Sequence, residues 1–114
     1  MNNCVFKGNL VNDPELRTTT NGKPVVNFRL AITHRYKAAD GSQNKETAYL
    51  NMEAWGTGAE NIHKYFQKGD PMLVQAHAKN HVWTDTDGNK RNKICFRVNE
   101  FEPCLARKKE AVTV

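Results

Sequence analysis

Aromatic side chains fall at outward positions of the predicted β-strands. Apolar and polar residues alternate over residues 47–55, and Tyr49 and Trp55 belong to the polar set. Trp83 continues the outward register of the strand that begins at residue 72, and Tyr36 follows the predicted second strand. A ring on a wet face exposes apolar surface, but it offers a platform on which a nucleobase stacks, worth about 1–3 kcal/mol per base. Stacking on unpaired bases is therefore the chemistry that these positions favour.

The alternative is that these rings belong to a core or an interface. A single Trp or Tyr in a small barrel has that role more often than it serves as a platform for a ligand. Helical or strand spacing assigns four other aromatic residues to the core, namely Phe28, Tyr65, Phe66 and Phe96. Several outward rings beside several cations favour nucleic-acid binding over this alternative.

Charge and composition narrow the classes of partner. The 114 residues hold 17 Lys and Arg against 12 Asp and Glu, a net charge of +5 that favours an anionic partner: nucleic acid, an acidic protein or a membrane surface. An apolar run of the roughly 18 residues needed to span a bilayer is absent, as is a signal-peptide pattern. Three cysteines without a Cys-x-x-Cys fit a reducing compartment. We therefore expect an intracellular, cytoplasmic protein that does not bind membranes.

Catalytic and metal-binding patterns are not found. His77 and His81 are four residues apart on a predicted strand, a separation of about 13 Å that is too long for one ion. Residues 56–61 resemble a dinucleotide loop, but Asn61 occupies its third glycine position. Residues 85–88 suit a hairpin turn better than a calcium loop. We predict no enzymatic activity, no cofactor and no metal.

Strands and turns alternate in an order that indicates one small barrel. Strands are predicted at residues 3–10 and within the alternating segments 26–32, 47–55, 72–79 and 93–99, and a helix at 58–68 that Gly69 terminates. Ala48, Leu50, Met52 and Ala54 are predicted to form the core face of the third strand, and Ile94, Phe96 and Val98 one face of the fifth. Five strands with a helix between strands 3 and 4 predict an all-β OB-fold barrel. Its domain should occupy residues 1–105, followed by a short flexible basic tail at 106–114.

Several short motifs resemble the bacterial and phage-type single-stranded DNA-binding proteins, in that family's order and spacing over residues 3–102. They are Gly8-Asn9-Leu10, Asp13-Pro14-Glu15-Leu16-Arg17, Asn21-Gly22, Trp55-Gly56 with Ala59-Glu60, Lys68-Gly69, and Trp83-Thr84-Asp85 with Gly88. The resemblance implies an OB-fold, no catalysis and a homo-oligomer, commonly a tetramer with a dimer as the other possibility. It also implies sequence-independent binding of single-stranded DNA in replication, recombination and repair.

The family's base-stacking positions fall on Tyr36, Tyr49, Trp55 and Trp83. By their placement near these rings, further residues are predicted to contact phosphate: Arg29, Arg35, Lys37, Lys79, Arg91 and Lys93, with Lys7 and Lys68 added to this set. Asn51, Thr57 and Val82 stand where relatives often carry a basic residue, which predicts weaker or less salt-sensitive binding. The chain stops at Val114 without the acidic tip through which bacterial relatives recruit replication and repair proteins, as expected of a truncated chain or a short plasmid, phage or mobile-element form.

Two other functions fit the same fold. A primosome-type OB-fold interaction module would bridge DNA and a helicase and would form a dimer. An RNA-binding OB domain would use the same stacking and phosphate contacts, which do not by themselves exclude a 2′-hydroxyl.

Overall fold

The computed structural model describes residues 1–104 of the chain. In chain order the elements are β1 (Cys4–Leu10), β2 (Glu15–Thr18), β3 (Pro24–Lys37), β4 (Gln43–Trp55), α1 (Gly56–Tyr65), β5 (Pro71–Thr84) and β6 (Lys90–Pro103). The predicted tail at 106–114 lies outside the described residues, so the predicted domain limit at residue 105 stays a prediction.

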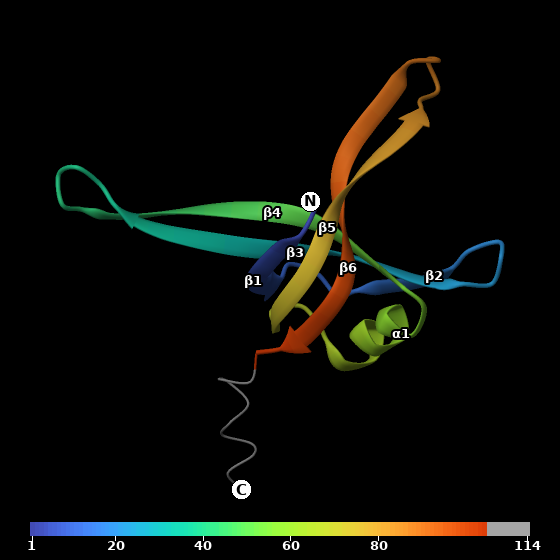
Figure 1. The fold of residues 1–114 in the computed structure, drawn as a ribbon, viewed down its shortest axis with the longest axis horizontal. Helices are drawn as coiled ribbons and strands as arrows, with labels where there is room; N and C mark the ends of the chain where they lie inside the picture. The colour runs from blue at the N-terminus through green and yellow to red at the C-terminus, as the bar shows by residue number, and fades with distance from the viewer. Residues whose placement is uncertain (105–114) are drawn as a thin grey trace, which may run out of the picture.

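Five of the strands close into a barrel (Figure 1). Their order is β1-β5-β6-β4-β3, and a pairing of β1 with β3 completes the ring. All of these pairings are antiparallel except that of β4 with β6. The helix α1 lies between the third and fourth barrel strands, so the predicted OB-fold is confirmed. The short β2, which the sequence reading did not predict, pairs with β3 outside this ring.

Barrel closure depends on a close approach at Gly8. Here β1, which pairs with β5 as far as Asn9, also begins to pair with β3, with Asn9 opposite Ala31 and Leu10 opposite Leu30. A Cβ added at Gly8 would overlap the Ala31 carbonyl oxygen and lie 3.0 Å from Cγ1 of Ile32. Only glycine therefore lets the two backbones meet without a shift of one of them.

The core lies inside the barrel and is sealed by the helix. The buried strand residues of the main core cluster are Leu10, Val26, Phe28, Leu30, Met52, Ala54, Met72, Val74 and Ala76, and half-buried Phe96, Val98 and Phe101 of β6 pack against it. Val25 and Cys95 are buried outside this cluster. Ala59 and Ile62 of α1 are fully buried against the strand residues of the cluster. Each large apolar side chain that leaves water in this way contributes about 1.5–3 kcal/mol. The period-2 pattern of β3, with Val26, Phe28 and Leu30 facing inward, is confirmed.

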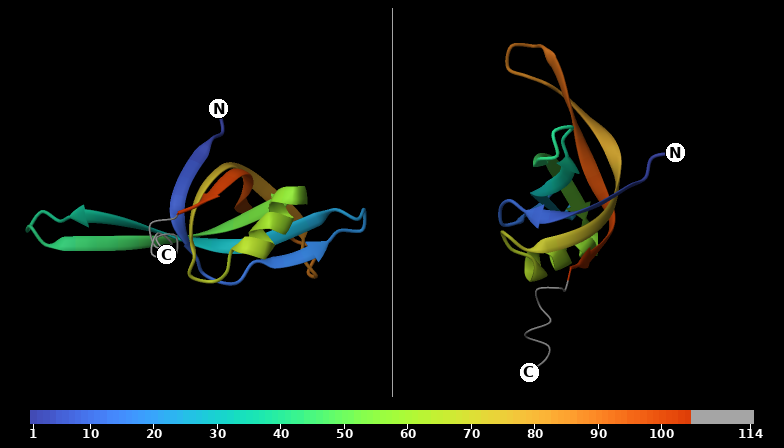
Figure 2. Two further views of the ribbon diagram at one scale, coloured as in Figure 1. Left: turned by 90° about the horizontal axis from the view of Figure 1, so that it is seen from below. Right: turned by 90° about the vertical axis from the view of Figure 1, so that its left-hand side faces the viewer.

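Three hairpins project from the barrel, formed by β2 with β3, β3 with β4, and β5 with β6. Figures 1 and 2 show them pointing in different directions. We call the outer parts of β3 and β4 the β3–β4 arm, and the outer parts of β5 and β6 the β5–β6 arm. Strand pairing runs along these arms to Lys37 opposite Gln43 and to Thr84 opposite Lys90. Ala48 and Ile94 are exposed because they lie on the arms beyond the core, so the prediction of Ala48 as a core residue was wrong.

The helix is shorter than predicted and begins earlier. It starts at Gly56, whose φ of +67° suits a residue without Cβ, and it ends at Tyr65, where extended Phe66 is the C-cap. Gly69 therefore does not terminate the helix but lies in the next turn, in which Asp70 N–H donates to the Gln67 carbonyl.

The residue at which the helix ends also decides whether Tyr65 and Phe66 are buried. Phe28 and Phe66 are buried, and Phe96 packs against the core with its ring edge-on to Phe6, as predicted. Tyr65 was wrongly assigned to the core, since 62% of it is exposed. The chain leaves the helix after Tyr65, so Phe66 takes the inward position and packs on Phe101.

Candidate functional site

A polar groove of about 470 Å³ lies on the outer face of the barrel, between β2, β3, β4 and the two strands of the β5–β6 arm. Outward residues of β4 form its floor, because Met52 and Ala54 point into the core and leave Asn51 and Glu53 on the other side. Its other lining residues include Asn12, Glu15, Arg17, Asn27, Arg29, His81, Lys93 and Cys95. Three of these are Arg or Lys, so the groove carries positive charge beside its carboxylates.

Tyr49 stands at the arm side of the groove. Its ring is 54% exposed, and the guanidinium carbon of Arg29 lies 5.2 Å from the ring centroid. Arg29 is on β3 opposite Asn51, two pairs along from Ala31 and Tyr49 and therefore on the same face of the sheet. An exposed ring and a groove-lining cation are thus neighbours, an arrangement that would suit base stacking beside a phosphate contact.

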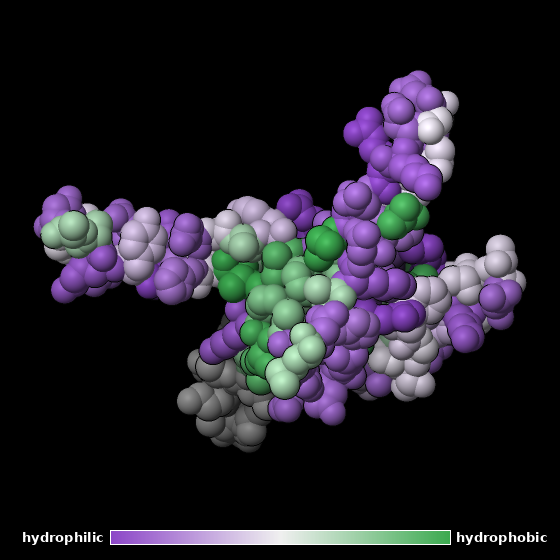
Figure 3. Space-filling view, turned by 45° about the horizontal axis from the view of Figure 1, so that its top comes forward, coloured by the Kyte–Doolittle hydropathy of each residue, from purple (hydrophilic) through white to green (hydrophobic). Residues whose placement is uncertain are grey.

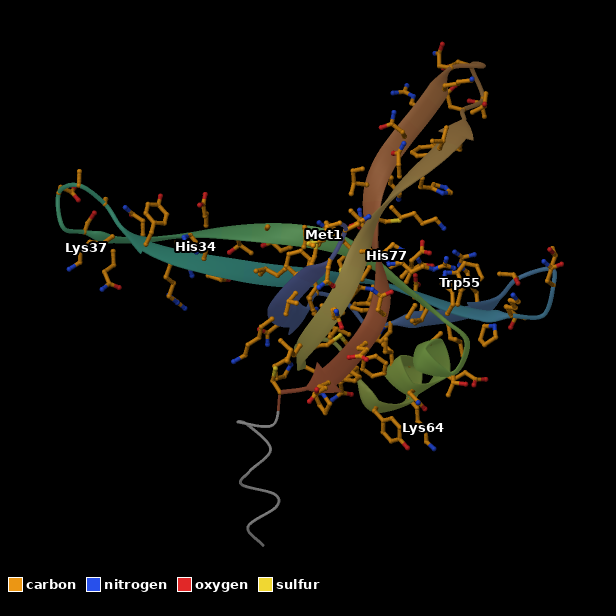
Figure 4. The ribbon with its side chains drawn as sticks, viewed as in Figure 1. Met1, His34, Lys37, Trp55, Lys64 and His77 are labelled. Carbon is orange, nitrogen blue, oxygen red and sulfur yellow. The ribbon has the colours of Figure 1, made fainter. Side chains whose placement is uncertain are left out.

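Trp55 ends β4 at the opposite side and is half-buried (Figure 4). Its indole Nε1 donates to Oε2 of Glu53 at 2.8 Å, and the guanidinium carbon of Arg97 lies 4.8 Å from the ring centroid. A hydrogen bond and a cation–π contact therefore fix both the edge and one face of this ring.

Trp83 lies on the β5–β6 arm, 39% exposed. Its ring stacks on the His81 ring at a centroid distance of 5.4 Å and an interplanar angle of 27°. His81 also lines the groove, so Trp83 lies next to the groove lining on the arm.

Tyr36 lies far along the β3–β4 arm, between His34 and Lys37 in the strand; Figure 4 labels those two residues. It stacks on His34 at 6.2 Å, and both residues continue the register of Leu30 and Ile32. Tyr49 pairs with Ala31 and so has the other register. By this alternation Tyr36 and Tyr49 lie on opposite faces of the arm.

The eight predicted phosphate-contacting residues divide into three groups. Arg29 and Lys93 line the groove, and Lys79 lies beside it with its ammonium 3.8 Å from Glu53 Oε2. Arg35, Lys37 and Arg91 are on the arms. Lys7 lies on β1 opposite Leu73, and Lys68 lies in the turn after α1, so neither is part of the groove lining.

Asp85 organises the tip of the β5–β6 arm. Its Oδ1 accepts the backbone N–H groups of Asp87 and Asn89, and its Oδ2 accepts from Arg91 Nε at 2.8 Å. The Arg91 side chain lowers the pKa of this carboxyl most, the backbone donors add to the effect, and the result is a pKa below the usual range. Arg91 thus has an ion-pair partner within the arm.

Glu53 is a carboxylate in the floor of the basic groove. Burial alone would raise its pKa, but the hydrogen bonds from Trp55 and Cys95 and the charges of Lys79 and Arg97 outweigh burial and hold the pKa below its usual value. The same surroundings act in reverse on Cys95, where burial and then the Glu53 charge raise the pKa of the thiol. Glu53 is therefore ionised and Cys95 is a neutral thiol at neutral pH.

Sequence reasoning missed two residues that line the groove, Arg17 and Glu53, and one that lies beside it, Arg97. Arg97 was in the outward set of its strand, but its aromatic neighbour in sequence, Phe96, was assigned to the core. Its contact with Trp55 arises because Glu53 and Arg97 are register partners of β4 and β6. Arg17 lies on the unpredicted β2 and donates to Asn27. Glu53 had the alternation of β4 as its signal, but a carboxylate did not fit an anion-binding face.

Two negative findings apply to residues 1–104. No group of three or more His, Cys, Asp or Glu side chains there is arranged to hold a metal ion. Nor does this part of the chain contain a helix with the length and apolar character to cross a membrane.

Comparison with known proteins identifies the family. The sequence profile of the single-strand binding protein family matches residues 1–104. A single-stranded DNA-binding protein of Deinococcus radiodurans is 37% identical over 94% of this chain and 35% of its own length. The single-stranded DNA-binding protein of Paenarthrobacter aurescens is 36% identical over 86% of this chain and 58% of its own length, and that of Wolinella succinogenes is 34% identical over 81% and 57%.

A solved structure has the same fold. It is a deletion mutant of the single-stranded DNA binding protein from Thermus aquaticus, with a TM-score of 0.82 and 22% identity over 94% of this chain and 52% of that one. The chain therefore spans roughly a third to three-fifths of the length of these relatives. With the profile matching nearly its whole length, the chain belongs to the single-strand binding protein family.

Proposed function

We propose that this chain binds single-stranded DNA without sequence preference and protects it during replication, recombination and repair. It acts as a binding protein and not as an enzyme, in the bacterial cytoplasm or nucleoid. The observation that supports this most is the groove together with the rings beside it: Tyr49 contacts the groove-lining Arg29, and Trp55 donates to Glu53 on the groove floor. Membership of the family and the names of the bacterial relatives agree with it.

Binding would divide the work between rings and cations. Bases stack on Tyr49, Trp55 and Trp83, and every base has a π-face, so stacking tolerates any sequence. Arg29 and Lys93 follow the phosphates from within the groove, and Arg35 and Lys37 extend the path along the β3–β4 arm. Tyr36 serves a segment of strand that passes the other face of that arm.

We also propose a homo-oligomer, with a tetramer favoured over a dimer. Val5 on β1 and Leu73 on β5 are exposed on neighbouring strands, and they line a shallow hollow of about 310 Å³ with Glu100 and Glu102. Figure 3 shows apolar surface gathered on the barrel beside the base of the β3–β4 arm. Apolar surface of this kind marks contact sites between proteins. Sedimentation of the whole chain tests the proposal, and a monomer at micromolar concentration would overturn it.

Tryptophan fluorescence tests the DNA-binding proposal directly, since Trp55 and Trp83 are the two tryptophans of the chain. Trp83→Phe leaves Trp55 as the reporter, and Trp55→Phe leaves Trp83. We expect oligo-dT to quench both, with log affinity falling against log salt by about 0.7 per phosphate neutralised. Duplex DNA and oligo-U are the comparisons. Equal binding of oligo-U would favour the RNA-binding alternative, and absent quenching would favour the module that binds a helicase.

A further inference from the structure

Glu53 is unusual for its surroundings. It is a carboxylate on the floor of a groove proposed to bind a polyanion, between outward Asn51 and Trp55 on β4. Its side chain is 15% exposed, so it does not extend into solvent away from the site. A neutral residue at this position would leave the groove with a larger positive charge. The contacts of the carboxylate suggest what it does there.

Four side chains converge on the Glu53 carboxylate. Oε2 accepts from Trp55 Nε1 at 2.8 Å and lies 3.5 Å from Arg97 Nε and 3.8 Å from Lys79 Nζ. Oε1 accepts from the Cys95 thiol at 3.5 Å. The carboxylate thus holds one ring and two cations of the candidate interface at once.

Lys79 and Arg97, which lie beside the groove, differ from the cations that line it. Lys79 and Arg97 already have a carboxylate partner, whereas Arg29 and Lys93 are in no ion pair among those found in residues 1–104. The Lys79 and Arg97 side chains remain 41% and 35% exposed, so a phosphate can reach them from solvent. A phosphate that binds either of them must compete with Glu53, because an ammonium or guanidinium shares its charge between both anions.

We propose that Glu53 is an internal competitor for DNA phosphate at Lys79 and Arg97, which weakens binding and reduces its salt dependence. While the carboxylate neutralises these cations, they release fewer counterions when DNA binds. The hydrogen bond to Trp55 does not involve the cations, so Glu53 still holds the edge of the ring when a phosphate draws Lys79 or Arg97 away. The inference rests on the proposed function and names a residue that lowers its affinity for DNA.

Glu53→Gln is the direct test. The amide removes the charge but keeps an oxygen that accepts from the Trp55 indole. We expect the slope of log affinity for oligo-dT against log salt to steepen by about 0.7 for each cation released, and affinity near about 0.2 M salt to rise about threefold per cation, from the same counterion relation. Glu60→Gln on α1 makes the same change in net charge outside the groove lining and should leave the slope unchanged.

Unchanged or weaker binding by folded Glu53→Gln protein would overturn the proposal, because a carboxylate that only positions Trp55 would give that result. A second pair of variants does not depend on altering Glu53. Lys79→Gln should lower the salt slope less than Lys93→Gln, since Lys79 is already neutralised; an equal or larger loss for Lys79→Gln would contradict the proposal. If the unaltered protein fails to bind oligo-dT, the proposed function itself fails, so the two failures are distinguishable.

Discussion

Trp55 and Trp83 are the same residue type, but their surroundings hold the two rings to different extents. Trp55 ends a barrel strand, is half-buried, and has its edge and one face held by Glu53 and Arg97. Trp83 projects from an arm, and its ring stacks on His81 of the same strand. The first ring is ordered before DNA arrives, while the second depends on the arm that carries it. A ring that is already held loses less side-chain entropy when a base stacks on it.

Removing both rings should have the largest effect. Each stacked base contributes about 1–3 kcal/mol, so Trp55→Ala with Trp83→Ala should weaken oligo-dT binding by about 30-fold or more. Trp55→Ala alone should cost more than Trp83→Ala alone, because it also leaves Glu53 without its indole donor. Fluorescence anisotropy of a labelled oligonucleotide measures all three. Equal affinity of the double variant would refute the role of both rings.

The barrel end of the groove should also depend on barrel closure. Gly8→Ala should destabilise the fold by about 1–3 kcal/mol, because the new Cβ overlaps the Ala31 carbonyl and forces the backbone to shift. Gly58→Ala is the matched control: its Cβ would lie at an ordinary 3.7 Å from Phe101, and alanine favours the helix by up to about 1 kcal/mol. Urea unfolding measures the stability of both variants. An unchanged stability of Gly8→Ala would show that the contact between β1 and β3 can accommodate a Cβ at this position.

Acid should destabilise the fold through two carboxylates, Glu53 on the groove floor and Asp85 at the tip of the β5–β6 arm. The folded pKa values of Glu53 and Asp85 lie below their usual values, so each ionised group stabilises the fold above its unfolded pKa near about 4. That stability is lost as the pH falls through the folded pKa. Chemical denaturation at pH about 7 and about 3 should therefore show a smaller loss for Glu53→Gln and for Asp85→Asn than for the unaltered chain. A full-sized loss in Glu53→Gln would assign acid sensitivity to other groups.

The smallest effects separate cations inside and outside the groove. Arg29→Gln should reduce the salt slope for oligo-dT by about 0.7, since Arg29 lines the groove beside Tyr49. Lys68→Gln, in the turn after α1, should leave the slope unchanged. A slope change of equal size for Lys68→Gln in a salt titration would mean that the strand continues past the helix.

The sequence was sufficient to predict which residues are buried wherever local periodicity and tertiary burial agree. Val26, Phe28 and Leu30 alternate within one barrel strand, and their burial followed from that pattern. It failed where a strand leaves the barrel: Ala48 keeps the core register but lies on an arm with no core to face. Alternation reports the face of a strand, not the point where the barrel ends.

The candidate site was predicted in the same partial way. Register alone placed Tyr49 and Trp55 on the groove face, because that depends on neighbours within one strand. The Arg97–Trp55 contact joins β6 to β4, whose parallel pairing no local pattern discloses. Tyr65 was misassigned because helical spacing cannot state at which residue the helix stops.

Because β4 contributes side chains to both the core and the groove, insertions and deletions within this strand should be poorly tolerated. Met52 and Ala54 face the core while Glu53 and Trp55 face the groove, so one strand builds both. A one-residue insertion or deletion near residue 52 would exchange the two faces, placing a carboxylate in the barrel interior and an apolar side chain on the groove floor. The turns at Asp40-Gly41 and Asp87-Gly88 carry no such constraint, and insertions accumulated over evolution should concentrate there.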